Sequence, residues 1–229
     1  MIKLAQGKPA PDLAVQLDSI CAEVNYDKEI RAAVITGSGP AFCGDIASAG
    51  RSQPAFSLSA PVASLNCPVI AAVNGDAIGI GLELALACDI RIAADIARFS
   101  LPGIGRGLMP SDGATQRLPR LLGRARAMEM MLSGQVIAAD EALRIGLVSR
   151  VVPAKDVLNA ALEMGREMAG KASWALRYCK EAVYKGLDMT LSQGLQLEGD
   201  LYFLLHTTED RTEGVNAFRE KRKPEFKGK

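Results

Sequence analysis

The sequence predicts an α/β fold, because short buried strands alternate with helical segments. Apolar runs at residues 31–36, 69–73 and 90–93 are typical of buried strands, and turn-forming residues follow the first two. Between the second and third runs, residues 81–88 are small and apolar, as in a buried helix. Strand, helix and strand in alternation favour a sheet covered by helices.

Further helices are predicted before and after these strands. Apolar side chains recur at helical spacing in residues 12–24. Beyond Gly107 the predicted elements are helices at 114–122, 125–132 and 138–145 and a strand at 148–152. From residue 157 onward we expect three longer helical stretches, with breaks near Lys171 and at Gly186. Residues 1–153 are therefore interpreted as an α/β core and residues 154–229 as a helical C-terminal region.

Composition indicates one globular core and no broad charged surface. The 229 residues are 48% hydrophobic, and 27 Lys and Arg balance 26 Asp and Glu. This balance argues against nucleic acid or an anionic membrane as a partner. The apolar runs are shorter than a membrane span and the N-terminus lacks signal-peptide features, so we expect a cytoplasmic protein.

Cysteine and histidine usage excludes several kinds of site. The five cysteines are scattered and include no Cys-x-x-Cys pair, so neither a disulfide framework nor a zinc site is indicated. His206 is the single histidine, which excludes mechanisms that need two imidazoles. We expect it to be a polar residue of a late helix.

A glycine-rich segment follows the strand at residues 69–73. Gly75, Gly79 and Gly81 precede the buried helix, so main-chain N–H groups could approach a ligand oxygen at its N-terminus. The Gly-x-Gly-x-x-Gly dinucleotide fingerprint would require a third glycine where Leu84 stands. Close packing of strand and helix remains an alternative explanation of these glycines.

The residues after this segment carry a family resemblance. Glu83 is followed by Cys88-Asp89-Ile90-Arg91-Ile92-Ala93, by Phe99-Ser100-Leu101-Pro102 and by residues 107–123, and together they resemble the enoyl-CoA hydratase/isomerase (crotonase) family. Similar matches occur at residues 31–37, 41–46, 142–148 and 208–224, so that the likeness covers nearly the whole chain from Leu13. It implies a crotonase-type β-β-α superhelix whose C-terminal helices form trimers or dimers of trimers. It also implies an acyl-CoA substrate, with no separate cofactor because CoA is part of that substrate.

The resemblance assigns the reacting end of the substrate to three residues. By position, the main-chain N–H groups of Gly44 and Ile80 would hold the thioester oxygen, where enolate charge develops. Glu83 falls on the first of the two catalytic glutamates of family hydratases. Burial would raise its pKa, whereas the nearby helix N-terminus would oppose that rise. Its alternative role is to complement the helix dipole.

Two departures from the family pattern affect these assignments. The second glutamate is absent, since Gly103 follows Pro102. Asp112 is a candidate replacement carboxylate, with capping of the helix that follows it as the alternative. The segment 42–45 is also two residues shorter than the family's Phe-x-x-Gly-x-Asp. It contains Cys43 and is followed by Ile46, and the resemblance places both residues in contact with CoA.

The C-terminal region supplies the remaining contacts that the resemblance implies. Lys221 matches a lysine that reaches the CoA phosphate of a neighbouring subunit, and Tyr202 matches an aromatic residue near the adenine; a solvated basic tail is the alternative for Lys221. The leading hypothesis is an enoyl-CoA hydratase that forms homo-oligomers. Alternatives are a lyase, isomerase or decarboxylase that uses one carboxylate, or a silent CoA-binding or RNA-binding subunit. The neutral charge argues against RNA.

Overall fold

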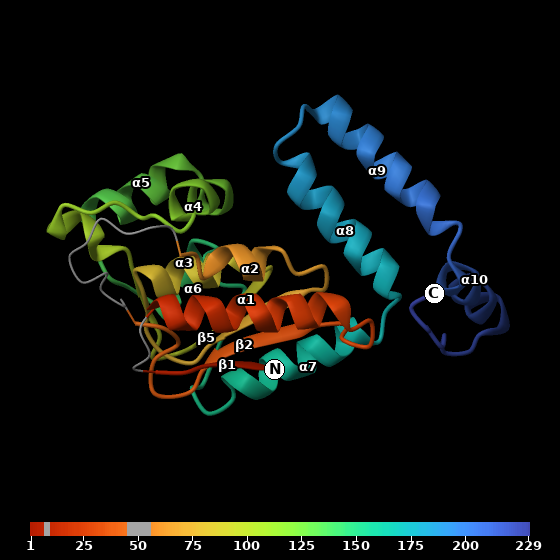
Figure 1. Ribbon diagram of the computed structural model, residues 1–229, viewed down its shortest axis with the longest axis horizontal. Helices are drawn as coiled ribbons and strands as arrows, with labels where there is room; N and C mark the ends of the chain where they lie inside the picture. Colours follow the sequence, from red (N-terminus) through yellow and green to blue (C-terminus); the bar gives the residue numbers. More distant parts are fainter. Residues whose placement is uncertain (7–9, 45–55) are drawn as a thin grey trace.

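The computed structural model describes residues 1–6, 10–44 and 56–229. Its main element is a sheet of five parallel strands in the order β1-β2-β3-β5-β8 (Figure 1). These strands are β1 (Ile2–Leu4), β2 (Ala33–Gly37), β3 (Val69–Val73), β5 (Ile90–Ala94) and β8 (Arg150–Val152). The three strands predicted from apolar runs form the centre of the sheet, which confirms the α/β class.

The central strand is buried because helices cover the sheet. All five residues of β3 are buried, and in register Ala71 lies between Ile35 of β2 and Arg91 of β5. The helix α7 (Val157–Ala169) packs on β2, β3 and β5, and Figure 1 shows α1 (Ala10–Tyr26) beside the sheet as well. Burial of both faces explains why these strands are continuous apolar runs rather than alternating patterns.

A small second sheet supports the helix that carries Glu83. Its strands are β4 (Ala77–Ile78), β6 (Arg98–Ser100) and β7 (Ile137–Ala138), in that order. The chain passes from β4 through Gly79 into α3 (Ile80–Ala87), whose residues after Ile80 are all buried. The helix was predicted within one residue. The three strands of this second sheet were not predicted, because segments of two or three residues show no periodicity.

The other core helices surround α3. They are α2 (Ser59–Ala63), η1 (Pro102–Arg106), α4 (Ala114–Leu122), α5 (Arg124–Ser133) and α6 (Ala139–Arg144). Helix α2 packs on α1 and α3, and α4 packs on α3 and α5. The N-terminus of α4 is thereby held near the start of α3.

The last three helices form a C-terminal arm that stands away from the sheet (Figure 1). They are α8 (Ser173–Gly186), α9 (Leu191–Leu205) and α10 (Glu209–Glu220), and α9 packs on α8. The sequence predicted three helical stretches after residue 157, but the described chain has four. The missed break follows α9, where Thr208 begins a new helix by accepting a hydrogen bond from the Arg211 N–H. The predicted core ends at residue 153, but α7 packs on the sheet and so belongs with the core. The arm begins with α8.

Candidate active site

The first turn of α3 brings a main-chain N–H group close to a carboxylate. Gly79 has φ 58°, a left-handed conformation that glycine adopts without steric cost. Its N–H donates to the Ser100 carbonyl oxygen at 2.8 Å, which ties the turn to β6. Ile80 begins the helix, and the N–H groups of a first helical turn have no partner within the helix. Glu83 belongs to the same first turn.

The segment that ends in Gly44 lies against this turn. Cys43 forms an isolated parallel bridge with Ala77, and its carbonyl oxygen accepts a hydrogen bond from the Ile78 N–H at 3.2 Å. The approach at Gly81 is so close that a Cβ there would lie 1.9 Å from the Cys43 carbonyl oxygen. These contacts bring the Gly44 segment to the start of α3.

Both main-chain N–H groups are available to a ligand. Neither the Gly44 N–H nor the Ile80 N–H donates a hydrogen bond to another residue of the described ranges. Gly44 is exposed and Ile80 is half-buried. Burial raises the pKa of the neighbouring Cys43 thiol to about 11, so the thiol is neutral near pH 7 and adds no negative charge here. Two N–H donors that have no partner in the described part of the chain, beside a neutral thiol, suit an oxygen that gains negative charge.

Glu83 is buried and is held through one of its two carboxylate oxygens. Its Oε1 accepts hydrogen bonds from the Asp112 N–H at 2.8 Å and the Ala114 N–H at 3.1 Å. The carboxylate thus binds the N-terminal end of α4, rather than only complementing the dipole of its own helix. Burial raises the pKa of Glu83 and the charge of Asp112 adds to the rise, whereas hydrogen bonds from main-chain N–H groups, of Ala114 in α4 and of Asp112 and Ser111 just before it, oppose it. The net upward direction suits a group that exchanges protons near neutral pH.

Asp112 does not cap the helix that follows it. The N-cap of α4 is Gly113, whose φ of 106° turns the chain between Asp112 and the helix. The Asp112 carboxylate instead accepts hydrogen bonds from the Leu58 N–H at 3.0 Å, the Ser59 N–H at 2.9 Å and the Ser57 hydroxyl. The capping interpretation was therefore wrong, because the preferred donors lie more than fifty residues earlier in the chain.

Two residues that the sequence did not single out hold this arrangement in place. Arg117 donates from Nη1 to the Asp112 carbonyl oxygen at 2.9 Å, and a Cβ at Gly113 would lie 2.0 Å from the same nitrogen. Ser57 binds the Asp112 carboxylate and also accepts from the Ala60 N–H at 2.8 Å. The sequence signal for Arg117 was its position one helical turn after Gly113, where only a glycine leaves room for the arginine side chain. No sequence pattern pointed to Ser57.

Comparison with known proteins decides which family this arrangement belongs to. Residues 12–229 match a family model described as Enoyl-CoA hydratase/isomerase. The 2,3-dehydroadipyl-CoA hydratase of Escherichia coli (strain K12) is 41% identical in an alignment 226 residues long, and the match covers 95% of this chain and 89% of that protein. The crotonyl-CoA hydratase of Syntrophomonas wolfei is 36% identical in an alignment 230 residues long, and the match covers 94% of this chain and 87% of that one. The chain belongs to the enoyl-CoA hydratase/isomerase family.

Solved structures of the enoyl-CoA hydratase/isomerase family confirm the predicted fold. An enoyl-CoA hydratase from Bacillus anthracis matches with a TM-score of 0.91 at 36% identity, covering 99% of this chain and 95% of that one. A second structure, from Geobacillus kaustophilus, matches with a TM-score of 0.89 at 36% identity, covering 99% of this chain and 94% of that one. The predicted crotonase fold and membership of an enzyme family are thereby confirmed, whereas trimer formation through the C-terminal helices stays a prediction.

One copy of the chain does not bring together all the residues that the resemblance assigned to the acyl-CoA site. Tyr202 lies on α9 with 62% of its surface exposed, and its ring meets the His206 ring edge-on at 5.1 Å between centroids. Lys221 ends α10 in a left-handed conformation with φ 55° and is exposed. Figure 1 shows α9 and α10 on the arm, away from α3. Ile46, the remaining expected CoA contact, lies outside the described residues.

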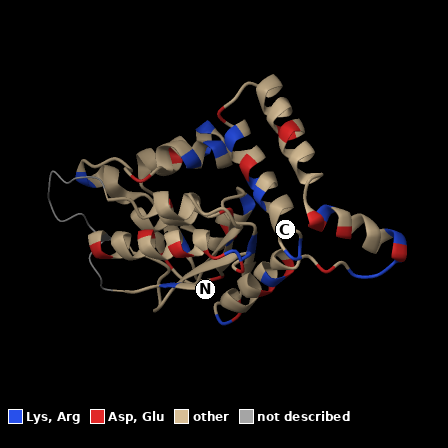
Figure 2. Ribbon diagram, turned by 45° about the vertical axis from the view of Figure 1, so that its right-hand side comes forward, with Lys and Arg blue, Asp and Glu red and all other residues tan. Residues whose placement is uncertain are grey.

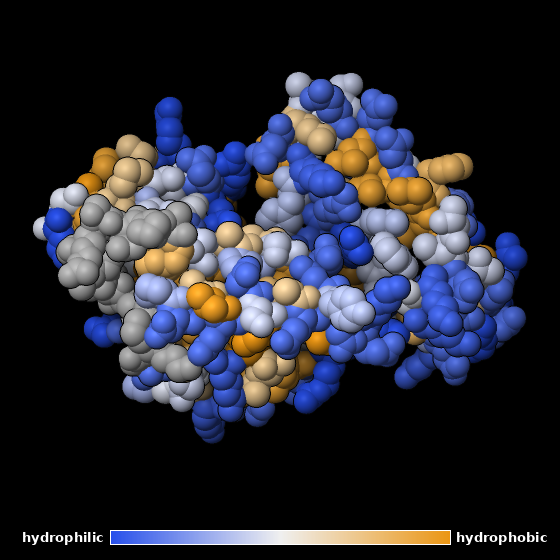
Figure 3. Space-filling model, viewed as in Figure 1, coloured by the Kyte–Doolittle hydropathy of each residue, from blue (hydrophilic) through white to orange (hydrophobic). Residues whose placement is uncertain are grey.

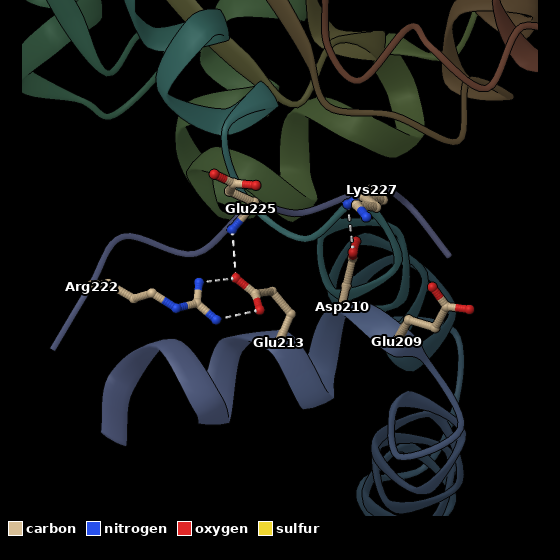
Figure 4. Close-up of a pocket in the computed structure, with 6 residues that line it drawn as sticks. All are labelled: Glu209, Asp210, Glu213, Arg222, Glu225 and Lys227. Carbon is tan, nitrogen blue, oxygen red and sulfur yellow. Dashed lines mark hydrogen bonds and ion pairs between the residues drawn. The ribbon is translucent and has the colours of Figure 1, made fainter. Parts of the chain in front are cut away.

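A cavity of about 380 Å³ lies in the arm rather than beside Glu83 (Figure 4). Its polar groups largely bind one another. Arg222 forms a bidentate ion pair with Glu213. The Asp210 carboxylate accepts hydrogen bonds from the Lys227 N–H at 2.7 Å and the Gly228 N–H at 2.8 Å. We therefore interpret it as the space left where the C-terminal segment folds back on α10.

The described residues show neither a membrane-spanning helix nor a metal cluster. No helix in ranges 1–6, 10–44 and 56–229 is long and apolar enough to cross a membrane. Across the same ranges, no group of three or more His, Cys, Asp and Glu side chains could hold a metal ion. In Figure 2, acidic and basic residues are interspersed along the helices.

Proposed function

We propose that this protein adds water to the carbon–carbon double bond of an enoyl-CoA thioester. The observation that carries the proposal is the common location of three groups at the start of α3: the Gly44 N–H, the Ile80 N–H and the Glu83 carboxylate. Two donors and a proton-exchanging carboxylate are what the hydration of a conjugated thioester requires.

In the proposed mechanism, the two N–H groups bind the thioester oxygen. Glu83 takes a proton from water as the water oxygen bonds to the β-carbon, and the electrons of the double bond move to the thioester oxygen. The enolate then collapses as its α-carbon takes the proton that Glu83 accepted from water, which returns Glu83 to its ionised form. Precedent for single oxyanion donors gives each N–H group about 3 to 4 kcal/mol of transition-state stabilisation.

The raised pKa and the anchoring of Glu83 support its role. Because Oε1 is held by the N–H groups of Asp112 and Ala114, the other oxygen is the one that we assign to the water molecule. Burial raises the pKa of Glu83, which brings its proton affinity nearer to the working range of a general acid and base. The helix N-terminus of α4 keeps the ionised form from becoming too costly.

We propose that Asp112 replaces the second catalytic glutamate, because glycine occupies the corresponding position 103. Its main chain contacts the Glu83 carboxylate directly, and its negative charge is one cause of the raised pKa of Glu83. To reach the water, its carboxylate would exchange one of its present hydrogen bonds, and the bond to the Ser57 hydroxyl is the one formed by a side chain.

The missing side chain at position 103 favours one second candidate function. With a single carboxylate at the start of α3, the same enolate-stabilising amides would serve an isomerase or lyase that moves one proton without adding water. Gly103 lies in η1, where a Cβ would approach the Leu108 carbonyl oxygen to 3.3 Å. A glutamate at position 103 would thus require a small adjustment of this loop.

We further propose that the complete site contains the arm of a second copy. The arm leaves many large apolar side chains exposed, and Figure 3 shows them gathered over α8 and α9. They include Val183, Leu187, Leu191, Leu195, Tyr202 and Phe203. A surface of this kind is typical of an interface. In an oligomer, Tyr202 and Lys221 would then serve the CoA bound to a neighbouring core.

The test is incubation of the protein with a panel of enoyl-CoA thioesters in deuterated water. Hydration is expected to give a 3-hydroxyacyl-CoA that carries deuterium at the α-carbon. Isomerisation with exchange but no gain of water would favour the second candidate, and unchanged thioesters without exchange would refute both.

A further inference from the structure

The turn that follows β3 binds the loop that leads to the oxyanion segment. Asn74 accepts a hydrogen bond at Oδ1 from the Gly37 N–H at 2.9 Å. Its Nδ2 donates to the Gly39 carbonyl oxygen at 2.7 Å and to the Ala41 carbonyl oxygen at 3.4 Å. A single side chain therefore contacts the beginning, the middle and the end of residues 37–41.

The main chain of the same turn continues these contacts. The Asp76 carbonyl oxygen accepts from the Phe42 N–H at 3.1 Å and the Cys43 N–H at 3.2 Å. At Gly75 the two segments are so close that a Cβ would lie 2.0 Å from the Pro40 carbonyl oxygen. The loop thus follows the turn residue by residue until it reaches Gly44.

The loop has little regular structure that would hold it otherwise. Residues 38–42 belong to neither a helix nor a strand. The Ser38 N–H binds the Leu4 carbonyl oxygen at 3.0 Å, and Gln6 Nε2 binds the Ala41 carbonyl oxygen at 3.0 Å, but Leu4 ends the edge strand β1 and Gln6 lies just beyond it. The position of the loop relative to α3 depends on the turn at residues 74–76.

The turn also leads directly to the second donor. From Asn74 the chain runs through β4 and Gly79 to Ile80, the first residue of α3. Because β4 pairs with both Cys43 and β6, its course is fixed once the turn is in place. The same few residues therefore locate the Gly44 N–H and the Ile80 N–H.

We propose that Asn74 is a positioning residue that sets the separation of the Gly44 and Ile80 N–H groups. The inference rests on the proposed function, in which both groups bind the thioester oxygen. Asn74 acts through the loop and does not contact the reacting atoms. Without its side chain, the carbonyl oxygens of Gly39 and Ala41 lose a donor and the Gly37 N–H loses an acceptor, so the loop shifts toward solvent.

The expected effect is on turnover more than on binding. Misplacement of a catalytic group by about 1 Å costs up to about a hundredfold in rate, and loss of a whole oxyanion donor costs about a hundredfold to a thousandfold. We expect Asn74→Ala to lower kcat by about tenfold to a hundredfold, while KM changes less than about threefold because CoA is held elsewhere.

A spectroscopic readout separates this role from general destabilisation. The probe is butanoyl-CoA, a saturated thioester that cannot be hydrated, with and without ¹³C at the carbonyl carbon. Isotope-edited infrared difference spectra of the bound probe report how strongly the oxyanion donors polarise the carbonyl group. In the wild-type protein the carbonyl band should lie below that of free butanoyl-CoA, and Asn74→Ala should return it more than halfway.

Asn25 offers a matched control. Its side chain also bridges a loop, donating to the Ser64 carbonyl oxygen at 3.1 Å and accepting from the Asn66 N–H at 2.9 Å. Asn25 itself lies on α1 and takes no part in the turn at residues 74–76. Asn25→Ala should lower Tm without changing the carbonyl band or kcat. Asn74→Asp is a second Asn74 variant of nearly unchanged volume, and its carboxylate faces two carbonyl oxygens, so it should shift the band at least as far as Asn74→Ala.

Each outcome bears on one of the two proposals. A lowered Tm with an unshifted band and normal kcat in both Asn74 variants would overturn the positioning role and leave the oxyanion assignment intact. A wild-type band identical to that of free butanoyl-CoA would overturn the oxyanion assignment and this inference with it. A band that moves only in the Asn74 variants, with Asn25→Ala unchanged, supports both.

Discussion

The α/β core and the C-terminal arm differ in how far their side chains find partners within the same chain. In the core, the groups of the candidate site bind one another: the Glu83 carboxylate binds the N-terminal end of α4, and the Asp112 carboxylate binds the N-terminal end of α2. In the arm, α8 has no buried residue and α9 has only Leu201. The described part of the core buries these groups within one chain, whereas the arm leaves large apolar side chains exposed, and for that surface we propose a second copy. Changes in the core should therefore affect turnover, and changes in the arm should affect CoA capture and assembly.

The strongest test of the core is Glu83→Gln. The amide keeps the shape and can still accept from the N–H groups of α4, but it cannot exchange protons near neutral pH. We expect kcat to fall by about a hundredfold to ten-thousandfold, the usual contribution of a general acid or base, while acyl-CoA binding survives. Steady-state kinetics and calorimetric titration with butanoyl-CoA measure the two effects. Near-normal turnover would remove Glu83 from the mechanism.

Asp112→Asn should have the next largest effect. If Asp112 replaces the missing second glutamate, hydration should slow by at least about tenfold, which corresponds to about 1.4 kcal/mol of barrier. Asp95→Asn is the control, since the Asp95 carboxylate also accepts a main-chain hydrogen bond, from the Ala154 N–H at 3.1 Å. An unchanged rate with a lowered Tm for Asp112→Asn would show that its contacts with residues 57–59 are structural only.

Deletion of residues 218–229 tests the arm. It removes Lys221 and neighbouring cations, so KM for CoA thioesters should rise by about tenfold, with a smaller change for thioesters that lack the 3′-phosphate nucleotide. Charge attraction to a phosphate is short-ranged and screened by salt, whereas the thioester end is held by the core. Sedimentation should show an oligomer for the full chain. A folded and active monomer would contradict the proposed division between core and arm.

Lys221→Ala should act in the same direction but more weakly. A single exposed cation contributes about 0 to 1 kcal/mol, so a rise in KM of less than about fivefold is expected. The control is Lys223→Ala, an exposed lysine of the same tail. The assignment of Lys221 fails if both variants change KM equally, or if the nucleotide-free thioester is affected as much as the CoA thioester.

The smallest expected effect is on the pH dependence of stability. Because the folded state raises the pKa of Glu83, its contribution to the free energy of unfolding is most favourable below the ordinary glutamate value of 4.5 and is lost as pH rises through the raised pKa. Glu83→Gln lacks this ionisation, so the stability of the variant relative to wild type should increase over that window. Urea unfolding at several pH values measures it, and a relative stability that falls instead would contradict the direction given for Glu83.

Much of the core could be predicted from the sequence. The strand at Val69–Val73 and the helix at Ala114–Leu122 were predicted with their observed bounds, and α3 within one residue. Long apolar or periodic segments carry their own signal, because burial dictates which positions are apolar. The family resemblance likewise depends on residue types at fixed spacings, and the roles that it assigns to Gly44, Ile80 and Glu83 stay predictions.

The tertiary structure decided which partners these residues have. The Asp112 carboxylate does not cap the next helix but binds Leu58 and Ser59, whose positions depend on how α2 packs on α3, and its catalytic role stays a proposal. From the sequence, Asn74 was recognised only as a residue that ends a strand in a turn. Its proposed positioning role depends on hydrogen bonds to a loop more than thirty residues earlier. A hydrogen bond is directional and local in space, so its partners follow from the packed fold rather than from spacing along the chain. The sequence alone therefore determined the elements and the chemical types at the site, while packing decided which donors each carboxylate and amide meets.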